Sequence, residues 1–170
     1  MIKLNVGCGA DYRNGFINID GSLILDNVDK RIDLSAESLL QYFESNSVDC
    51  ILANDIIEHL FHWEAVLLLN DFYNLLKNGG YCEIRVPDCE YIISSELSIS
   101  EKLLLLFGGQ DIPQKMNEEM DKSRKMFPHF FCHKYGWTIE KIKKELTIIG
   151  FENIKFKKEN TNFITTAMKK

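Results

Sequence analysis

The chain has 170 residues, of which 45% are hydrophobic and 26% are charged, with a formal net charge of −5. This composition is typical of a globular protein and predicts a single domain, residues 1–170, that buries about two-thirds of its unfolded surface. The negative charge argues against nucleic acid as a partner, because phosphates attract basic surfaces.

The sequence also predicts where the protein resides. Met1-Ile2-Lys3-Leu4 leads directly into strand-like residues, so we expect no signal peptide. The apolar run at residues 103–107 is far too short to cross a bilayer. Five cysteines at irregular spacing favour a reducing, cytoplasmic compartment.

Strand-like and helix-like segments alternate along the chain. The strand-like runs are residues 3–6, 16–20, 28–33, 48–54, 81–86, 152–158 and 162–168. Apolar spacing and capping residues predict helices over residues 36–43, 63–76, 99–107 and 139–149. This alternation predicts an α/β layer structure with a mostly parallel sheet.

Capping signals set the expected ends of these helices. Ser35 is a plausible N-cap for the first helix, and the glycines of residues 78–80 should stop the second. Ser98 and Glu101 have the spacing of a capping box, and Gly108-Gly109 should end the helix that it opens.

The connection between the first two strands is unusually short. Only nine residues, Gly7 to Gly15, join them. Extended, they reach roughly 30 Å, which is enough to return along a strand of about 17 Å but leaves no room for a covering helix. We therefore expect a loop here, or at most one helical turn.

Polar residues follow each of the first four strands, at the edge where parallel strands form a ligand-binding crevice. The four segments are Gly7-Cys8-Gly9, Asp20-Gly21-Ser22, Asp33-Leu34-Ser35 and Asn54-Asp55. For an adenosine-type ligand, Asp20 would accept from both ribose hydroxyls and Asp33 from an exocyclic amine. Backbone carbonyls near Asn54 would hold an ammonium group. These segments predict a nucleoside-containing cofactor.

Six ordered motifs between Leu4 and Asp88, about half of the chain, resemble the class I S-adenosylmethionine (SAM)-dependent methyltransferases. The motifs are Leu4-Asn5-Val6-Gly7-Cys8-Gly9, Phe16-Ile17-Asn18-Ile19-Asp20, Arg31-Ile32-Asp33-Leu34, Asn46-Ser47-Val48-Asp49, Asp55-Ile56-Ile57-Glu58-His59-Leu60, and Leu75-Leu76-Lys77-Asn78-Gly79-Gly80 before a strand that ends Val86-Pro87-Asp88. Within that superfamily the chain is similar to small methyltransferases of the type 11-like group, often found among genes for surface glycans and metabolites.

The resemblance implies a Rossmann-like three-layer sandwich. Its seven-stranded sheet would have the order 3-2-1-4-5-7-6, with strand 7 antiparallel. It also implies SAM as cofactor, with S-adenosylhomocysteine (SAH) as its product. The expected cofactor-binding residues are Asn5, Gly7, Cys8, Gly9, Asp20, Gly21, Asp33, Leu34, Asn54 and Asp55.

The chain departs from the family pattern in three ways. Asn5 replaces the usual acid, no third glycine follows Gly9, and the helices that normally precede the first strand are missing. The same turn disfavours NAD, whose pyrophosphate needs a G-x-G-x-x-G turn at a helix N-terminus. Here Ala10-Asp11 adds a negative charge, which the SAM sulfonium tolerates.

His59 follows the fourth strand and would lie near the transferred methyl group, where it could remove a proton from an acceptor hydroxyl. The alternative is a residue that only shapes the pocket. For Asp55 and Glu58, in the same segment, helix capping explains the residue as well as function does.

A second cluster, residues 127–137, is rich in aromatic and histidine side chains before the last helix. His133 is the second candidate base, because related proteins carry a similar histidine-lysine segment here. His129, Tyr135 and Trp137 are candidates for substrate binding, as is Asp88 after the fifth strand. The alternative is a loop whose aromatics fill the edge of the core. A zinc site from His129, Cys132 and His133 matches no common spacing, so we expect no metal.

The charged segment of residues 113–126 is expected to be a solvated helix or a mobile lid over the substrate. Together these features predict a methyltransferase that acts on a small polar acceptor, with a sugar hydroxyl in glycan biosynthesis as the leading hypothesis. The alternatives are an inactive SAM-binding module that serves as a partner subunit and an NAD-dependent oxidoreductase. A homodimer or a partner chain would cover the cofactor edge that the missing helices leave open.

Overall fold

The structure is a computed structural model that describes residues 1–108, 110 and 118–170. Its seven-stranded sheet has the order β3-β2-β1-β4-β5-β7-β6. The strands are β1 (Lys3–Val6), β2 (Ile17–Asp20), β3 (Lys30–Arg31), β4 (Val48–Asn54), β5 (Leu76–Pro87), β6 (Glu152–Glu159) and β7 (Asn162–Met168). β7 pairs antiparallel with β5 and β6, and the other pairs are parallel. The predicted strand order and the antiparallel seventh strand are confirmed.

Helices follow the strands as the sequence pattern predicts. They are α1 (His62–Leu75), α2 (Cys89–Ser94), α3 (Ile99–Phe107), α4 (Glu118–Met126) and α5 (Ile139–Ile149), with short 3-10 helices η1 (Leu39–Gln41), η2 (Ile57–His59) and η3 (Pro128–Phe130). The Ser98–Glu101 capping box is confirmed, and Gly108 ends α3 in the left-handed conformation at φ 80°.

Two predictions about the helices are wrong: the length and N-cap of the first helix, and the residues that end the second. The helix expected over residues 36–43 is only the single turn η1, capped by Ser38 instead of Ser35, because Asp71 accepts hydrogen bonds from the Ser38 hydroxyl and the Leu39 amide. α1 ends at Leu75, and the following residue pairs at once with Val48 of β4. The glycines of residues 78–80 therefore lie inside β5 instead of capping α1. Gly109 and residues 113–117 of the charged segment lie outside the described residues.

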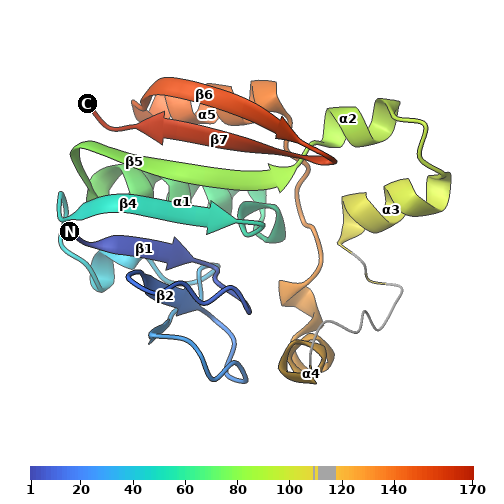
Figure 1. Cartoon of the computed structure of the whole chain (residues 1–170), viewed down its shortest axis with the longest axis horizontal. Helices are drawn as coiled ribbons and strands as arrows, with labels where there is room; N and C mark the ends of the chain where they lie inside the picture. Colours follow the sequence, from blue (N-terminus) through green and yellow to red (C-terminus); the bar gives the residue numbers. More distant parts are fainter. Residues whose placement is uncertain (109, 111–117) are drawn as a thin grey trace.

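The helices α1 and α5 lie together on one face of the sheet (Figure 1). Their buried side chains, such as Phe72 and Leu146, join Leu4, Ile51 and Ile84 of the strands in one hydrophobic core. The core therefore lies between the sheet and this helical layer.

On the opposite face, the loop of residues 7–15 folds back over β1 and β2. Side chains alternate between the faces of a strand, so Asn5 and Asn18 point away from the core. Asn5 Nδ2 donates to the Asp11 carbonyl at 2.7 Å, and Asn18 Oδ1 accepts from the Arg13 amide at 2.9 Å. The predicted absence of a crossover helix is confirmed. In the expected three-layer sandwich, this loop lies where the first helix of the second helical layer would be.

None of the helices in the described part of the chain is both long and apolar enough to cross a membrane. All five cysteines are free thiols.

Candidate functional site

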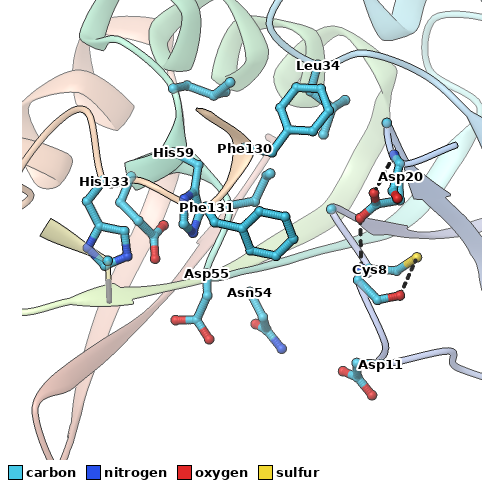
Figure 2. A pocket seen from close by; sticks show the side chains of 18 of the residues that line it. Cys8, Asp11, Asp20, Leu34, Asn54, Asp55, His59, Phe130, Phe131 and His133 are labelled. Carbon is cyan, nitrogen blue, oxygen red and sulfur yellow. Dashed lines mark hydrogen bonds between the residues drawn. The ribbon is translucent and has the colours of Figure 1, made fainter. Parts of the chain in front are cut away.

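The main cavity lies at the carboxyl ends of the parallel strands and has a volume of about 970 Å³. Figure 2 shows Asp20 of β2 with Cys8 and Asp11 of the loop that follows β1 on one side of it. The two histidines lie on the other side, and Asn54 and Asp55 lie between them. All ten predicted cofactor-binding residues line this cavity, and so do both predicted catalytic histidines. Among these predicted residues, the fold brings together positions up to 128 apart in the chain, from Asn5 to His133.

The first turn of the cavity wall depends on its glycines. Gly7 and Gly9 have φ values of 67° and 51°, in the left-handed region that glycine adopts without strain. A Cβ on Gly7 would lie 2.6 Å from the side chain of Ile56, so no larger residue fits there without displacing its neighbour. The turn thus exposes the backbone of Gly7, Cys8 and Gly9 to the cavity.

Asp20 is held in place by this turn. Its Oδ2 accepts from the Gly9 amide at 2.8 Å and its Oδ1 accepts from the Ser22 amide at 2.8 Å (Figure 2). Each carboxylate oxygen has a further lone pair, so the group can accept two more hydrogen bonds from a ligand. The Asp20 carboxylate is therefore oriented before any ligand arrives.

The thiol of Cys8 is only 5% exposed, although the residue lines the cavity. Burial, together with the negative charge of Asp20, raises its pKa to about 12. The thiol therefore stays protonated at neutral pH and is a poor nucleophile.

The third segment of the wall contains Asp33 and Leu34. Asp33 Oδ1 accepts from the amide of Ser35 at 3.0 Å and from its hydroxyl at 2.6 Å. Leu34 is 9% exposed and packs with the core, so it offers an apolar surface beside a carboxylate. This combination suits a flat, partly polar ring.

Asn54 and Asp55 follow β4 but differ in how their side chains are engaged. Asp55, at φ 52°, is ion-paired with Arg85 and accepts from Asn162 Nδ2 at 3.0 Å. Asn54 Oδ1 is buried and has no hydrogen-bond partner within the described residues. Because a buried acceptor without a partner is unfavourable, Asn54 Oδ1 is a candidate contact for a ligand donor.

Glu58, His59 and His133 form the other end of the cavity. Burial lowers the pKa of His59 to about 4, with His133 adding to the effect, and burial also lowers the pKa of His133. Burial, reinforced by the charge of Asp55, raises the pKa of Glu58 well above its usual range. Without a ligand, burial therefore disfavours the charged form of all three groups.

Backbone hydrogen bonds hold this cluster together. The amides of Lys134 and Tyr135 donate to the Glu58 carbonyl at 2.8 Å and 3.2 Å. His59 Nδ1 lies 3.1 Å from the Cys132 carbonyl, so Nδ1 carries the hydrogen and Nε2 is left as the basic nitrogen. Glu58 was not selected as a site residue from the sequence, because helix capping explained it equally well and only the adjacent His59 indicated function.

The segment after β5 closes the cavity on the side of β1 and β2. Ser123 and Met120 of α4 are buried and line the cavity, and the Ser123 hydroxyl is hydrogen-bonded to that of Ser22 at 2.9 Å. Phe130 and Phe131 also line it. Residues 118–126 of the charged segment form a helix, as one of the two interpretations predicted, with exposed charged residues and one buried face, that of Met120 and Ser123.

None of the four residues predicted to bind substrate lines the main cavity. Asp88 is 3% exposed and caps α2 by accepting from the Tyr91 amide, while Trp137 is 1% exposed within the core. His129 is exposed on η3. Tyr135 lines a second, smaller groove of about 670 Å³, which shares His133 and Lys134 with the main cavity.

A mostly parallel sheet with a cavity at the carboxyl ends of its parallel strands is a Rossmann-like α/β arrangement, and folds of this kind bind ligands at that edge. No protein-family model and no curated protein matches the sequence. Solved structures do match it. A SAM-dependent methyltransferase from Archaeoglobus fulgidus is 14% identical with a TM-score of 0.61, and the match covers 98% of this chain and 85% of that chain.

Two further matches have the same fold. A Thermotoga maritima SAM-dependent methyltransferase, described as a possible histamine N-methyltransferase, is 14% identical with a TM-score of 0.66, covering 99% of this chain and 82% of that chain. Phosphoethanolamine N-methyltransferase 2 from Haemonchus contortus, solved with phosphomonomethylethanolamine and SAH, is 15% identical with a TM-score of 0.60. That match covers 99% of this chain but only 48% of the enzyme. The chain therefore has the class I SAM-dependent methyltransferase fold, as the motifs predicted.

Proposed function

We propose that this protein is a SAM-dependent methyltransferase. The observation that carries the proposal is the Asp20 carboxylate, which the amides of Gly9 and Ser22 orient at the rim of the cavity. A carboxylate in this position, after the second parallel strand, is suited to the two hydroxyls of a ribose.

The other cofactor contacts follow from the position of the ribose. The adenine would lie against Leu34, with Asp33 available to its exocyclic amine. The methionine end would extend along the Gly7–Gly9 backbone toward Asn54, whose unpaired Oδ1 suits the ammonium group. The sulfonium cation would be favoured by a cavity whose rim carries Asp20, Asp33 and Asp55.

The methyl acceptor would occupy the end of the cavity beside His59 and His133. A volume of about 970 Å³ is near the upper end for ligand pockets, which leaves room for a small acceptor next to the cofactor. We propose a hydroxyl of a sugar or of a similar small polar metabolite as the acceptor. One of the two neutral histidines would receive the proton as the oxygen attacks the methyl carbon in line with the departing sulfur.

The remaining parts of the proposal concern context. A single domain in a reducing, cytoplasmic compartment is consistent with the five free thiols. The substrate would be a small molecule or glycan precursor, and the net charge of −5 disfavours nucleic acid.

Isothermal titration calorimetry with SAM and SAH tests the proposal. We expect one site with an affinity in the micromolar range for both ligands, and no heat with NAD or NADH. The absence of binding by SAM and SAH to folded protein would overturn the proposal. Turnover of SAM by the isolated chain with any acceptor would distinguish an enzyme from a SAM-binding partner subunit.

A further inference from the structure

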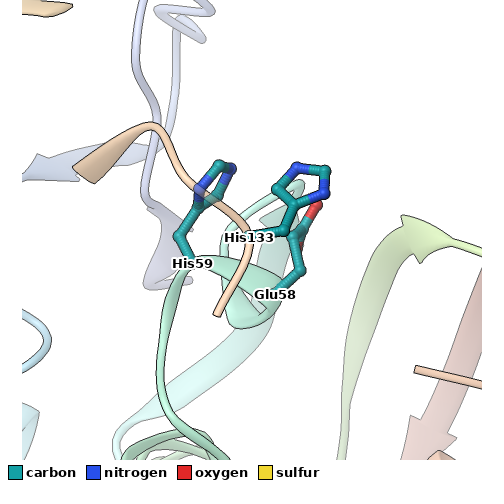
Figure 3. Close-up of side chains that lie close together, drawn as sticks. All are labelled: Glu58, His59 and His133. Carbon is teal, nitrogen blue, oxygen red and sulfur yellow. The ribbon is translucent and has the colours of Figure 1, made fainter. Parts of the chain in front are cut away.

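The side chains of Glu58, His59 and His133 converge at the acceptor end of the main cavity (Figure 3). Glu58 and His59 belong to η2, whereas His133 comes from the segment between η3 and α5. One ligand-type atom from each residue lies within 4.8 Å of the other two. The fold thus places one carboxylate and two imidazoles around a common point.

Glu58 is the unusual member of this group. The residue is 2% exposed, and neither carboxylate oxygen has a hydrogen-bond partner among the residues that the structure describes. Burying such a group without partners is costly, so natural structures almost always pair it or bind an ion to it. Because both oxygens are closed to solvent, a small ion fits this place better than a substrate does.

His59 already has the kind of hydrogen bond that metal-binding histidines use. His59 Nδ1 lies 3.1 Å from the Cys132 carbonyl, and the His133 ring lies close to the backbone of Leu105 and Leu106. Such bonds to backbone carbonyls fix the ring orientation and leave the second nitrogen as a ligand. For His59 this leaves Nε2 available to an ion, and one ring nitrogen of His133 lies within reach of the same point.

We propose that Glu58, His59 and His133 bind a divalent first-row transition metal ion. Two imidazoles with one carboxylate are a donor set that suits zinc and iron, whereas magnesium and calcium prefer oxygen ligands alone. With bonds of about 2.1 Å, tetrahedral ligands lie roughly 3.4 Å apart. The three atoms must therefore move together by about 1 Å at most, which small side-chain rotations can supply.

The position of the site determines what a bound ion would do to the methyl acceptor. His59 and His133 line the cavity at the end where the acceptor is proposed to sit. With an ion bound, both histidines would be ligands, and the ion would polarise the acceptor oxygen in their place. The binding site itself does not depend on the proposed methyl transfer.

The test uses the full chain, stripped of metal with EDTA and then titrated with Zn²⁺ in a calorimeter, with bound zinc counted by mass spectrometry. We expect one zinc per chain. Glu58→Gln and His133→Ala should each weaken binding by at least about tenfold. The controls Cys132→Ser and His129→Ala alter the neighbouring zinc-type residues and should stay within about threefold of wild type.

Far-ultraviolet circular dichroism and a thermal melt show whether each metal-free variant is folded, and SAH binding tests the cofactor proposal separately. The metal proposal is overturned if the stripped wild-type chain takes up no stoichiometric Zn²⁺, Mn²⁺ or anaerobic Fe²⁺. It is also overturned if Glu58→Gln binds zinc as wild type does. Loss of zinc binding in Cys132→Ser alone would assign the ion to the segment of residues 129–133 instead.

Discussion

Replacing Asp20 by asparagine isolates the charge and acceptor capacity of one side chain with almost no change in shape. In the structure, the two carboxylate oxygens of Asp20 accept from the Gly9 and Ser22 amides. An asparagine has one acceptor oxygen, so its amide nitrogen must face one of these two N–H groups. The variant therefore loses both the charge and the symmetric arrangement that would receive the ribose.

The expected loss of affinity follows from the strength of hydrogen bonds to charged groups, about 1.5–3 kcal/mol each. Asp20→Asn removes one such bond to the ribose and weakens the other, so we expect a loss of about 2–4 kcal/mol in SAH binding. This corresponds to roughly a 30- to 1,000-fold rise in Kd, and Asp20→Ala should lose at least as much.

The assay is calorimetry with SAH, and Asp29→Asn is the matched control. Asp29 Oδ2 likewise accepts from a backbone amide, that of Asn18 at 2.7 Å, but Asp29 does not line the cavity. We expect Asp29→Asn to bind SAH within about twofold of wild type. If folded Asp20→Asn also binds SAH within about threefold of wild type, the assignment of Asp20 to the ribose is wrong.

Two further predictions concern the thiol and the glycine beside the cavity. Because the pKa of Cys8 is raised to about 12, about one thiol in ten thousand is ionised at pH 8, so iodoacetamide should modify Cys8 far more slowly than the half-buried Cys132. Site-resolved mass spectrometry checks this, and equal rates would contradict it. Gly79→Ala, at φ 81° in open space, should cost about 1–2 kcal/mol of stability. Gly108→Ala, at φ 80° with a Cβ only 2.6 Å from the Phe131 carbonyl, should cost at least about 1 kcal/mol more in urea unfolding, and equal losses would refute the packing argument.

The parts of the fold that local sequence determines could be predicted closely. β1, β4 and β7 have the predicted bounds, because consecutive apolar or β-branched residues between turn residues leave little choice. The α3 capping box was also predictable, since its two partners are three residues apart. The wrong end of α1 has a non-local cause: pairing of Leu76 with Val48 ends the helix before the glycines.

The cofactor side of the site could be predicted because parallel strands align their carboxyl ends. Once the strands were assigned, the residues after each of them had to meet at one edge of the sheet. The acceptor side could not be predicted in this way. Glu58 and His133 are brought together because the Lys134 and Tyr135 amides both donate to the Glu58 carbonyl. No local sequence pattern predicts this long-range contact.

The aromatic cluster shows the limit of composition as a guide to substrate binding. Trp137 and Tyr135 are two residues apart, yet Trp137 is buried in the core and Tyr135 lines the smaller groove. An aromatic residue near a predicted cavity could either pack in the core or line the cavity. Which of these it does depends on the path of the backbone, which the composition does not give. His133 and Lys134 line both cavities, so these two members of the cluster connect them.

The loop of residues 7–15 and the helix α4 together form the wall of the cavity near Gly9. Because residues 7–15 form a loop and not a crossover helix, no helix from this connection covers the turn at Gly9. In the structure, α4 supplies cover from another part of the chain, with Met120 near Gly9 and Ser123 bonded to Ser22. Phe130, Phe131 and His133, which follow α4, also line the cavity, so residues 118–133 form a wall at both its proposed cofactor end and its proposed acceptor end. Changes in this one segment should therefore alter cofactor affinity and acceptor choice together.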